Sequence, residues 1–136
     1  IPSQTHALRY LKRVAKNNAG ASLVVCGHSK GGNLAVWAAV HAEKEVRDAV
    51  KAVYNFDGPG FLPEIVNSDE YLEIVPKVKS YMPQGSVVGV IMYNESECNI
   101  VKSTAKGFLQ HTVVSWQVLG THFVTESQFE NSSIIF

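Results

Sequence analysis

A serine between two glycines is the residue of this chain whose setting best fits covalent chemistry. Ser29 lies in the segment 27–32, which reads Gly-His-Ser-Lys-Gly-Gly. The segment follows a short apolar run at 22–26 and precedes an apolar stretch at 33–42. A strand, a G-x-S-x-G turn and a buried helix in this order form a nucleophile elbow, in which the serine hydroxyl stands exposed on a sharp turn. The pattern therefore predicts that Ser29 is the nucleophile of a serine hydrolase.

The residues next to Ser29 fit the same turn. Glycine at 27 and 31 is expected to leave room where side chains would clash with the neighbouring strand and helix. The N-terminus of the following helix directs N–H groups at the site, so we predict that the Lys30 N–H donates to an oxyanion. The alternative is a glycine-rich turn that binds a phosphate, although the segment lacks the G-x-x-x-x-G-K-[ST] and G-x-G-x-x-G spacings that such turns use.

A serine nucleophile needs a base, and the chain order typical of this fold is serine, acid, histidine. Of the five histidines, His111 and His122 lie well downstream of Ser29, whereas His28 lies inside the elbow and flanks the serine. His111 follows a predicted loop at 107–110, and catalytic groups of such folds lie in loops at the strand ends. His111 is therefore the predicted base. His122 falls within a hairpin pattern, which favours a structural role, and stays the alternative.

The third group is a carboxylate that orients the base. Asp57 follows the predicted strand 51–56, which places it at the same edge of the sheet as Ser29. The turn chemistry of Asp-Gly-Pro-Gly is a simpler explanation for this aspartate. Glu95 and Glu97 lie in a polar stretch that could reach His111 from another loop. Asp57 is the predicted acid, with either glutamate as the alternative.

Apolar periodicity and turn residues predict an α/β fold. The pattern indicates helices after Ser3 and at 33–42, 43–50 and 61–75, the last broken near 67–68, and strands at 22–26, 51–56, 78–82 and 99–103. Segment 86–93 fits helix or strand, and 115–124 fits a hairpin that turns at 119–121. Alternation of strands and helices favours a mostly parallel sheet flanked by helices.

Composition limits the possible partners and location. With 136 residues, 46% of them hydrophobic, the chain is expected to form one domain, 1–136, around one core. Twelve basic and twelve acidic residues give no net charge to attract nucleic acid or an anionic membrane. No apolar run approaches the roughly 20 residues of a membrane span, so we expect no transmembrane segment and a cytoplasmic location. Two cysteines are too few for a disulfide framework, and Cys26 is expected to be a buried free thiol.

Three segments of the chain resemble a known family. They are Gly-His-Ser-Lys-Gly-Gly-Asn-Leu-Ala at 27–35, Tyr-Asn-Phe-Asp-Gly-Pro-Gly-Phe at 54–61, and Gln110-His111 followed by Trp116. Together they resemble the Mbeg1-like family, over a stretch from about Leu8 to Phe123. This family is similar to the class 3 lipases. The resemblance implies an α/β-hydrolase fold, a triad of serine, aspartate and histidine, and hydrolysis of esters, lipids among them. We expect no cofactor and no metal.

The chain departs from the lipase pattern in two places. In class 3 lipases the acid follows the next strand, a place that falls here at 84–86, where the residues are Gln, Gly and Ser. Asp57 would then be a substitute from the preceding strand. Such a fold also has several strands before the elbow, so the chain is expected to be the C-terminal part of a longer protein. An open sheet edge left by absent strands predicts a homo-oligomer.

The leading hypothesis is cleavage of a small-molecule or lipid ester through an acyl-serine intermediate. One alternative is a non-catalytic ligand-binding or interaction domain that keeps the elbow. Another is an acyltransferase, in which an alcohol replaces water as the acceptor of the same acyl group.

Overall fold

The computed structural model describes residues 2–92 and 96–126, and its centre is a sheet whose first four strands are parallel. In their order across the sheet, the strands are β1 (Leu23–His28), β2 (Val50–Phe56), β3 (Val78–Pro83), β4 (Glu97–Val101) and the antiparallel β7 (Thr125–Glu126). The spatial order follows the chain order, so each strand pairs with the next one along the sequence. The predicted α/β class with a mostly parallel sheet is confirmed.

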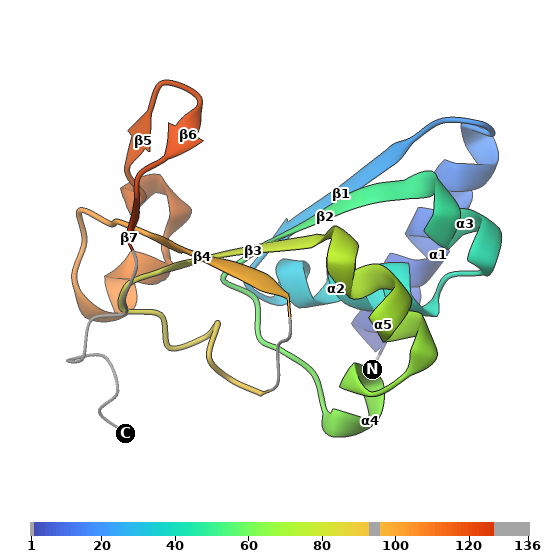
Figure 1. Ribbon diagram of the computed structural model, residues 1–136, viewed down its shortest axis with the longest axis horizontal. Coiled ribbons are helices and arrows are strands. Elements are labelled where there is room, and N and C mark those ends of the chain that lie inside the picture. The colour runs from blue at the N-terminus through green and yellow to red at the C-terminus, as the bar shows by residue number, and fades with distance from the viewer. Residues whose placement is uncertain (1, 93–95, 127–136) are drawn as a thin grey trace.

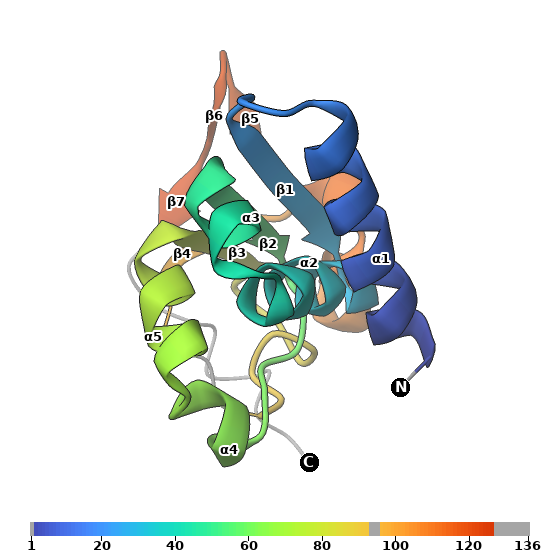
Figure 2. The same ribbon diagram turned by 90° about the vertical axis from the view of Figure 1, so that its right-hand side faces the viewer.

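Helices cover one face of this sheet. They are α1 (Pro2–Asn17), α2 (Lys30–His41), α3 (Lys44–Ala49), α4 (Pro63–Val66) and α5 (Asp69–Ile74). Because the parallel strands follow one another, each right-handed crossover steps in the same direction and returns on the same side of the sheet. Figure 1 shows α1, α2 and α5 below the strands, and Figure 2 shows α2 between α1 and α5.

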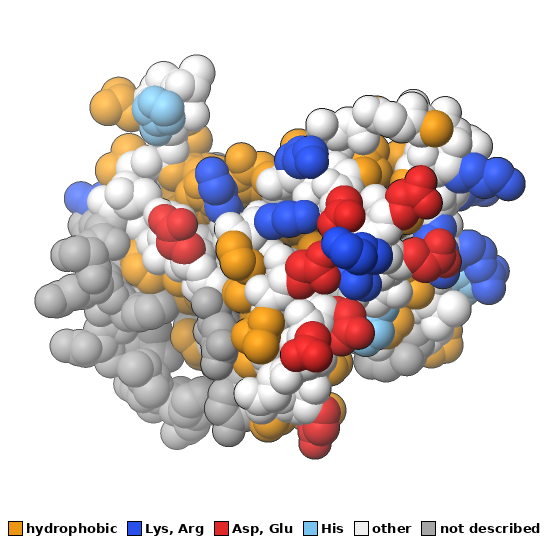
Figure 3. Space-filling view, turned by 45° about the vertical axis from the view of Figure 1, so that its right-hand side comes forward, with side chains coloured by type: hydrophobic (Ala, Val, Ile, Leu, Met, Phe, Trp, Pro, Cys, Tyr) orange, Lys and Arg blue, Asp and Glu red, His pale blue; other side chains and the backbone are white. Residues whose placement is uncertain are grey.

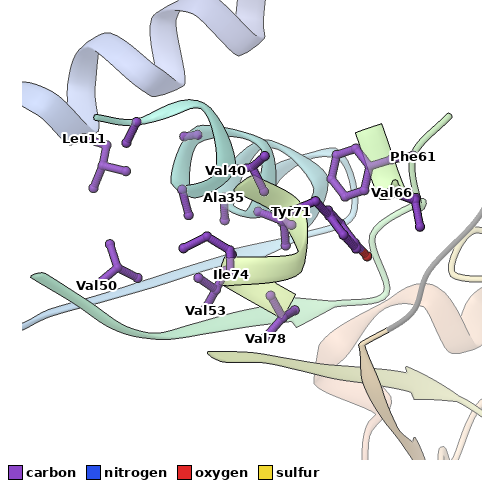
Figure 4. Packing of buried hydrophobic residues seen from close by; sticks show 14 residues of the cluster. Leu11, Ala35, Val40, Val50, Val53, Phe61, Val66, Tyr71, Ile74 and Val78 are labelled. Carbon is purple, nitrogen blue, oxygen red and sulfur yellow. The ribbon is translucent and has the colours of Figure 1, made fainter. Parts of the chain in front are cut away.

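The main core lies between α2 and the strands. The α2 sequence is apolar almost all round, which predicts a buried helix, and Val36, Ala39 and Val40 are each at most 2% exposed. Figure 4 shows α1, α2, α5 and the strands contributing side chains to one cluster. In that cluster Val53 of β2 and Ile74 of α5 are fully buried. The expected break near 67–68 is present, where the Ser68 hydroxyl accepts the Tyr71 N–H and begins α5.

The opposite face of the sheet carries an aromatic cluster instead of helices. Phe56 and Tyr81 lie side by side with ring centroids 5.7 Å apart, and Phe123 packs 5.3 Å from Tyr81. Phe123 belongs to the predicted hairpin, which is formed by β5 (Val118–Leu119) and β6 (His122–Phe123). Gly120 in its turn has a φ of 63°, a conformation that glycine adopts without steric cost. The aromatic cluster therefore ties the C-terminal hairpin to the parallel strands.

Two expectations about β1 are wrong. The continuous apolar run at 22–26 is typical of a strand that is buried on both faces, and Cys26 was expected to be a buried thiol. Instead Val24 is 63% exposed and Cys26 is exposed. The reason is that β1 is an edge strand and the helices cover only its other face. A purely apolar run cannot reveal whether a second layer lies against it. Cys26 and Cys98 are both free thiols, as expected.

Segment 86–93 forms neither of the elements proposed for it. Its described part, up to Met92, consists of turns and bends, one of which is fixed by a hydrogen bond from the Gly60 N–H to the Ile91 carbonyl of 2.8 Å. Strand β7 was not predicted, because two residues are too short for a periodic pattern. The described residues also form three short 3-10 helices: η1 (Val75–Lys77), η2 (Gly107–His111) and η3 (Val113–Ser115).

Charges of both signs are mixed on the surface. In Figure 3, acidic and basic side chains alternate over the helical side of the molecule. Ion pairs account for several of them, including Lys12 with Glu43 at 2.7 Å and Arg47 with Glu73 at 3.1 Å. No helix in the described part of the chain combines the length and the apolar character that crossing a bilayer requires.

Two residues of α5 offer a matched test of the core. We expect Ile74→Ala to lower the free energy of unfolding by about 2–5 kcal/mol, because it leaves a cavity where the side chain is 0% exposed. Leu72 is 50% exposed, so Leu72→Ala should change the free energy by less than about 1 kcal/mol. Urea unfolding followed by tryptophan fluorescence measures both. Equal losses in the two variants would contradict this packing of α5.

Candidate active site

Ser29 lies on a strained turn between β1 and α2. Its φ of 56° and ψ of −128° belong to a region that residues other than glycine rarely adopt, at a cost of about 1–3 kcal/mol. Hydrogen bonds on both sides maintain this conformation. The Ser29 N–H donates to the Phe56 carbonyl at 2.8 Å, and the Ser29 carbonyl accepts the N–H groups of Gly32 and Asn33 at 2.9 and 3.3 Å. The backbone thus has the sharp strand-to-helix turn that the motif predicts.

Two of the three glycines around Ser29 are sterically required. A Cβ at Gly27 would collide with the backbone of Gly31, and a Cβ at Gly32 would collide with the side-chain oxygen of Asn55. The same expectation for Gly31 is wrong, because a Cβ there would meet nothing within 4 Å. Gly31 points toward the groove between α1 and the open edge of β1, where no strand lies in the described structure.

The N-terminus of α2 lies directly behind Ser29. Lys30 is the first residue of the helix, and its N–H precedes the Gly32 and Asn33 groups that close the first turn. The first N–H groups of a helix have no intrahelical acceptor, and together with the helix dipole they favour a negative charge. The Lys30 N–H is therefore in the position from which a backbone group donates to an oxyanion.

Asp57 directly follows β2, as Ser29 directly follows β1. Residues His28 and Phe56 are register partners in the parallel ladder, so the two residues that come next lie at the same edge of the sheet. The Asp57 N–H donates to the Tyr81 carbonyl at 2.7 Å. Asp57 also has a positive φ, 52°, and is only 2% exposed. A buried carboxylate on a strained turn is costly for stability, and such features concentrate at functional sites.

Three donors surround the Asp57 carboxylate. One oxygen, Oδ2, lies 2.7 Å from Nδ1 of His111. The other, Oδ1, accepts the Ser86 hydroxyl and the Gly89 N–H, the latter at 3.1 Å. An ionised carboxylate can only accept, so Nδ1 of His111 carries the proton and Nε2 is left to accept one. The structure therefore brings together the predicted acid and the predicted base.

The loop that carries His111 is fixed by its neighbours. The side-chain oxygen of Gln110, a residue 2% exposed, accepts the Gly85 N–H at 2.9 Å. The indole N–H of Trp116 donates to the Gln110 carbonyl at 2.7 Å. These contacts anchor the end of η2 beside the carboxyl ends of β3 and β4. Gln110-His111 and Trp116, which together form the third segment of the family resemblance, are thus joined by a direct hydrogen bond.

Ser86 and Gly89 also contact the carboxylate of Asp57, and neither was predicted from the sequence as part of the site. Ser86 stands in the place where the lipase pattern has its acid, and here its hydroxyl donates to Asp57, the predicted acid, which follows the neighbouring strand. The sequence did offer a sign of this role. Segment 84–86 has a polar residue, Ser86, where the lipase pattern has its carboxylate, and a hydroxyl in that place can donate a hydrogen bond to a carboxylate from the adjacent strand. Gly89 approaches so closely that a Cβ there would lie 2.6 Å from Asp57 Oδ1.

The alternative residues lie elsewhere. Glu97 is exposed at the first residue of β4, where it pairs with Lys79, at the amino end of the strands rather than the carboxyl end. Glu95 lies outside the described residues. His122 is exposed on β6. Among the described residues, the histidine that contacts Asp57 is His111.

The thiol of Cys98 does not compete with Ser29 as a nucleophile. Burial of its sulfur and, to a smaller extent, the negative charge of Asp57 raise the pKa of Cys98 to about 11. The thiol therefore stays protonated at neutral pH, and a protonated thiol is a poor nucleophile. Across residues 2–92 and 96–126, His, Cys, Asp and Glu side chains form no group of three or more suited to a metal ion.

Comparison with known proteins agrees with the motifs. A family model described as Mbeg1-like matches residues 1–136 of the chain. A search of curated proteins finds no match. The family match spans the elbow, the Asp57 turn and the His111 loop, so all three parts of the candidate site lie within the matched residues.

The two glycines of the G-x-S-x-G motif should respond differently to substitution. We expect Gly27→Ala to lower the free energy of unfolding by about 3 kcal/mol, because its Cβ would overlap backbone atoms of Gly31. Gly31→Ala should leave stability unchanged or raise it by up to about 1 kcal/mol, since its Cβ is unobstructed and alanine favours helix. Urea unfolding of both variants tests this. A Gly31→Ala variant as unstable as Gly27→Ala would contradict it.

Proposed function

The chain belongs to the Mbeg1-like family, and we propose that it is a serine hydrolase that cleaves carboxylic esters. The observation that carries the proposal is the Asp57–His111 hydrogen bond of 2.7 Å at the sheet edge on which the strained Ser29 turn lies. Catalytic triads recur on unrelated folds and are recognised by the geometry and roles of their members. Here the acid comes from β2, which lies directly beside the strand that ends in the serine.

In the first half of the reaction, Nε2 of His111 takes the Ser29 hydroxyl proton as Oγ attacks the ester carbonyl carbon. The carbonyl oxygen becomes negatively charged, and the Lys30 N–H donates to it. The tetrahedral intermediate then expels the alkoxide, which takes the proton from His111 and leaves as the alcohol. Asp57 stabilises the imidazolium that forms between these two proton transfers, since its carboxylate accepts a hydrogen bond from the Nδ1–H group and stays ionised.

In the second half, water replaces the alcohol. His111 removes a proton from water, the hydroxide adds to the acyl carbon, and the collapse of the second intermediate returns the proton to Ser29 Oγ and releases the acid. An acyltransferase would use an alcohol in this step. Product analysis separates the two reactions, because only hydrolysis releases a free carboxylic acid.

Apolar side chains on both sides of the base favour an ester with an apolar acyl group. Phe108 and Leu109 on η2 are 80% and 70% exposed, and Val114 on η3 is 88% exposed. Exposed large apolar residues that cluster on one segment commonly mark a binding surface. The proposed substrates are accordingly small-molecule or lipid esters.

We also propose that the protein self-associates through the open edge of β1. On the described chain β1 pairs with β2 on one side only, and its segment Leu23–Cys26 carries no charged residue or proline that would discourage pairing with another strand. A second copy could add its own β1 to this edge.

Labelling with a fluorophosphonate tests the nucleophile and its base. We expect the probe to attach to Ser29 and the label to disappear in Ser29→Ala. His111→Ala should slow labelling and ester turnover by about 10²–10⁴-fold, because the serine loses its general base. His122→Ala is the matched control and should react as the wild type does, since this exposed histidine lies on β6 away from Asp57. Mass spectrometry locates the label.

Absence of labelling at Ser29 in the wild-type protein would reject the hydrolase in favour of a non-catalytic domain that keeps the elbow. Equal losses in His111→Ala and His122→Ala would reject His111 as the base.

Sedimentation velocity tests the sheet edge. We expect the wild-type protein to self-associate with rising concentration and Val24→Lys to stay monomeric, because a charged edge residue opposes strand pairing. Val24 is 63% exposed, so the substitution should leave the core intact. A wild-type protein that is monomeric at all concentrations would contradict the prediction.

A further inference from the structure

The imidazole of His28 joins the nucleophile elbow to the loop of the base. His28 is the last residue of β1 and is half-buried. Its Nε2 lies 2.8 Å from the backbone carbonyl oxygen of His111, and the two imidazole rings lie 4.6 Å apart at an angle of 34°. A carbonyl oxygen can only accept a hydrogen bond, so Nε2 of His28 is the donor and carries a proton.

The segment that ends at His111 is held in place mainly by polar contacts. His111 ends η2, a single 3-10 segment whose Phe108 and Leu109 side chains are largely exposed. Little apolar burial therefore fixes this segment against the sheet. The contacts of Gln110 with Gly85 and Trp116 anchor the preceding residue. The His28 contact acts on the backbone of residue 111 itself, and it comes from the strand that ends in Ser29.

We infer that His28 is a positioning residue for the proposed reaction: its Nε2–H holds the backbone of His111 while Asp57 holds the ring of His111 at Nδ1. The base is then fixed at two points, one from β1 and one from the turn after β2. Proton transfer requires heavy atoms within about 2.6–3.2 Å, and a displacement of about 1 Å can cost 10²-fold in rate. This inference rests on the proposed function, because the base must act on Ser29 for its position to matter.

The geometry makes a specific demand of position 28. The side chain needs an N–H donor four bonds from Cα, which is where histidine has Nε2. Glutamine has an amide nitrogen at the same number of bonds, whereas the amide nitrogen of asparagine is one bond shorter. His28→Gln and His28→Asn therefore form a matched pair that differs in reach and keeps the same donor chemistry.

The experiment measures the fluorophosphonate labelling rate of Ser29 in the wild type and both variants, together with kcat and KM for a p-nitrophenyl ester. We expect His28→Asn to lower the labelling rate and kcat by about 10–100-fold with KM changed less than about threefold, because the base and not the substrate site is displaced. His28→Gln should restore both rates to within about threefold of the wild type. Thermal unfolding shows whether the two variants are equally stable, as a role in positioning alone requires.

A second readout does not depend on activity. The carbonyl ¹³C resonance of His111 should shift in His28→Asn and stay near its wild-type position in His28→Gln, because it reports the hydrogen bond directly. Wild-type labelling rates in His28→Asn, or equal losses in both variants, would overturn the inference, as would an unchanged His111 resonance in His28→Asn. A wild-type protein that is not labelled while the resonance moves as expected would instead overturn the proposed function.

Discussion

The candidate site depends on the parallel register of β1, β2 and β3. His28 pairs with Phe56 and Phe56 pairs with Tyr81, so β1 and β2 end level with one another, while β3 continues beside them to Pro83. The hydrogen bonds continue one residue past the first two strand ends, where Ser29 donates to the Phe56 carbonyl and Asp57 to the Tyr81 carbonyl. These bonds fix two residues with positive φ side by side. A slip of one residue would turn both side chains to other faces, because the side-chain period of a strand is two.

Buried polar groups around Asp57 stabilise what the register brings together. An unpaired carboxylate at 2% exposure would be strongly unfavourable, but the Ser86 hydroxyl, the Gly89 N–H and the His111 Nδ1–H all donate to it. Helix α2 also holds the turn that follows Asp57, because the Asn33 side-chain amide donates to the carbonyls of Pro59 and Gly60 at 3.1 and 3.0 Å. The helix that begins at the elbow therefore also fixes the turn of the acid. This coupling explains how Asp57, the proposed acid, can follow the strand next to the one that leads to Ser29, with Ser86 at the place where the lipase pattern has its carboxylate.

The aromatic cluster on the other face of the sheet links the base to the same strands. Phe56 is in ring contact with Trp116 at 6.3 Å, and the Trp116 indole N–H donates to the residue before the base. Phe56 also accepts the Ser29 N–H through its carbonyl. Phe56 of β2 thus contacts the Ser29 turn through its backbone and, through its ring, the Trp116 side chain that holds the His111 loop. Apolar packing on this face and polar contacts at the sheet edge position the same three segments.

Patterns of neighbouring residues were enough to predict the local parts of this arrangement. The elbow, the buried α2, the turn at Asp57 and the hairpin at Gly120 follow from patterns of nearby residues, because steric limits on φ and apolar periodicity act over a few positions. The contact between Asp57 and His111 could not be read from such patterns, because the two residues are far apart in the chain. Local position favoured Asp57 over Glu97 and His111 over His122, but it did not show that the favoured carboxylate and the favoured histidine meet. The exposure of Val24 and Cys26, the open space at Gly31 and the contact of His28 with the His111 carbonyl were likewise decided only by the tertiary structure. Each depends on which segment lies opposite, and that is a property of the packed layers and not of any single stretch of sequence.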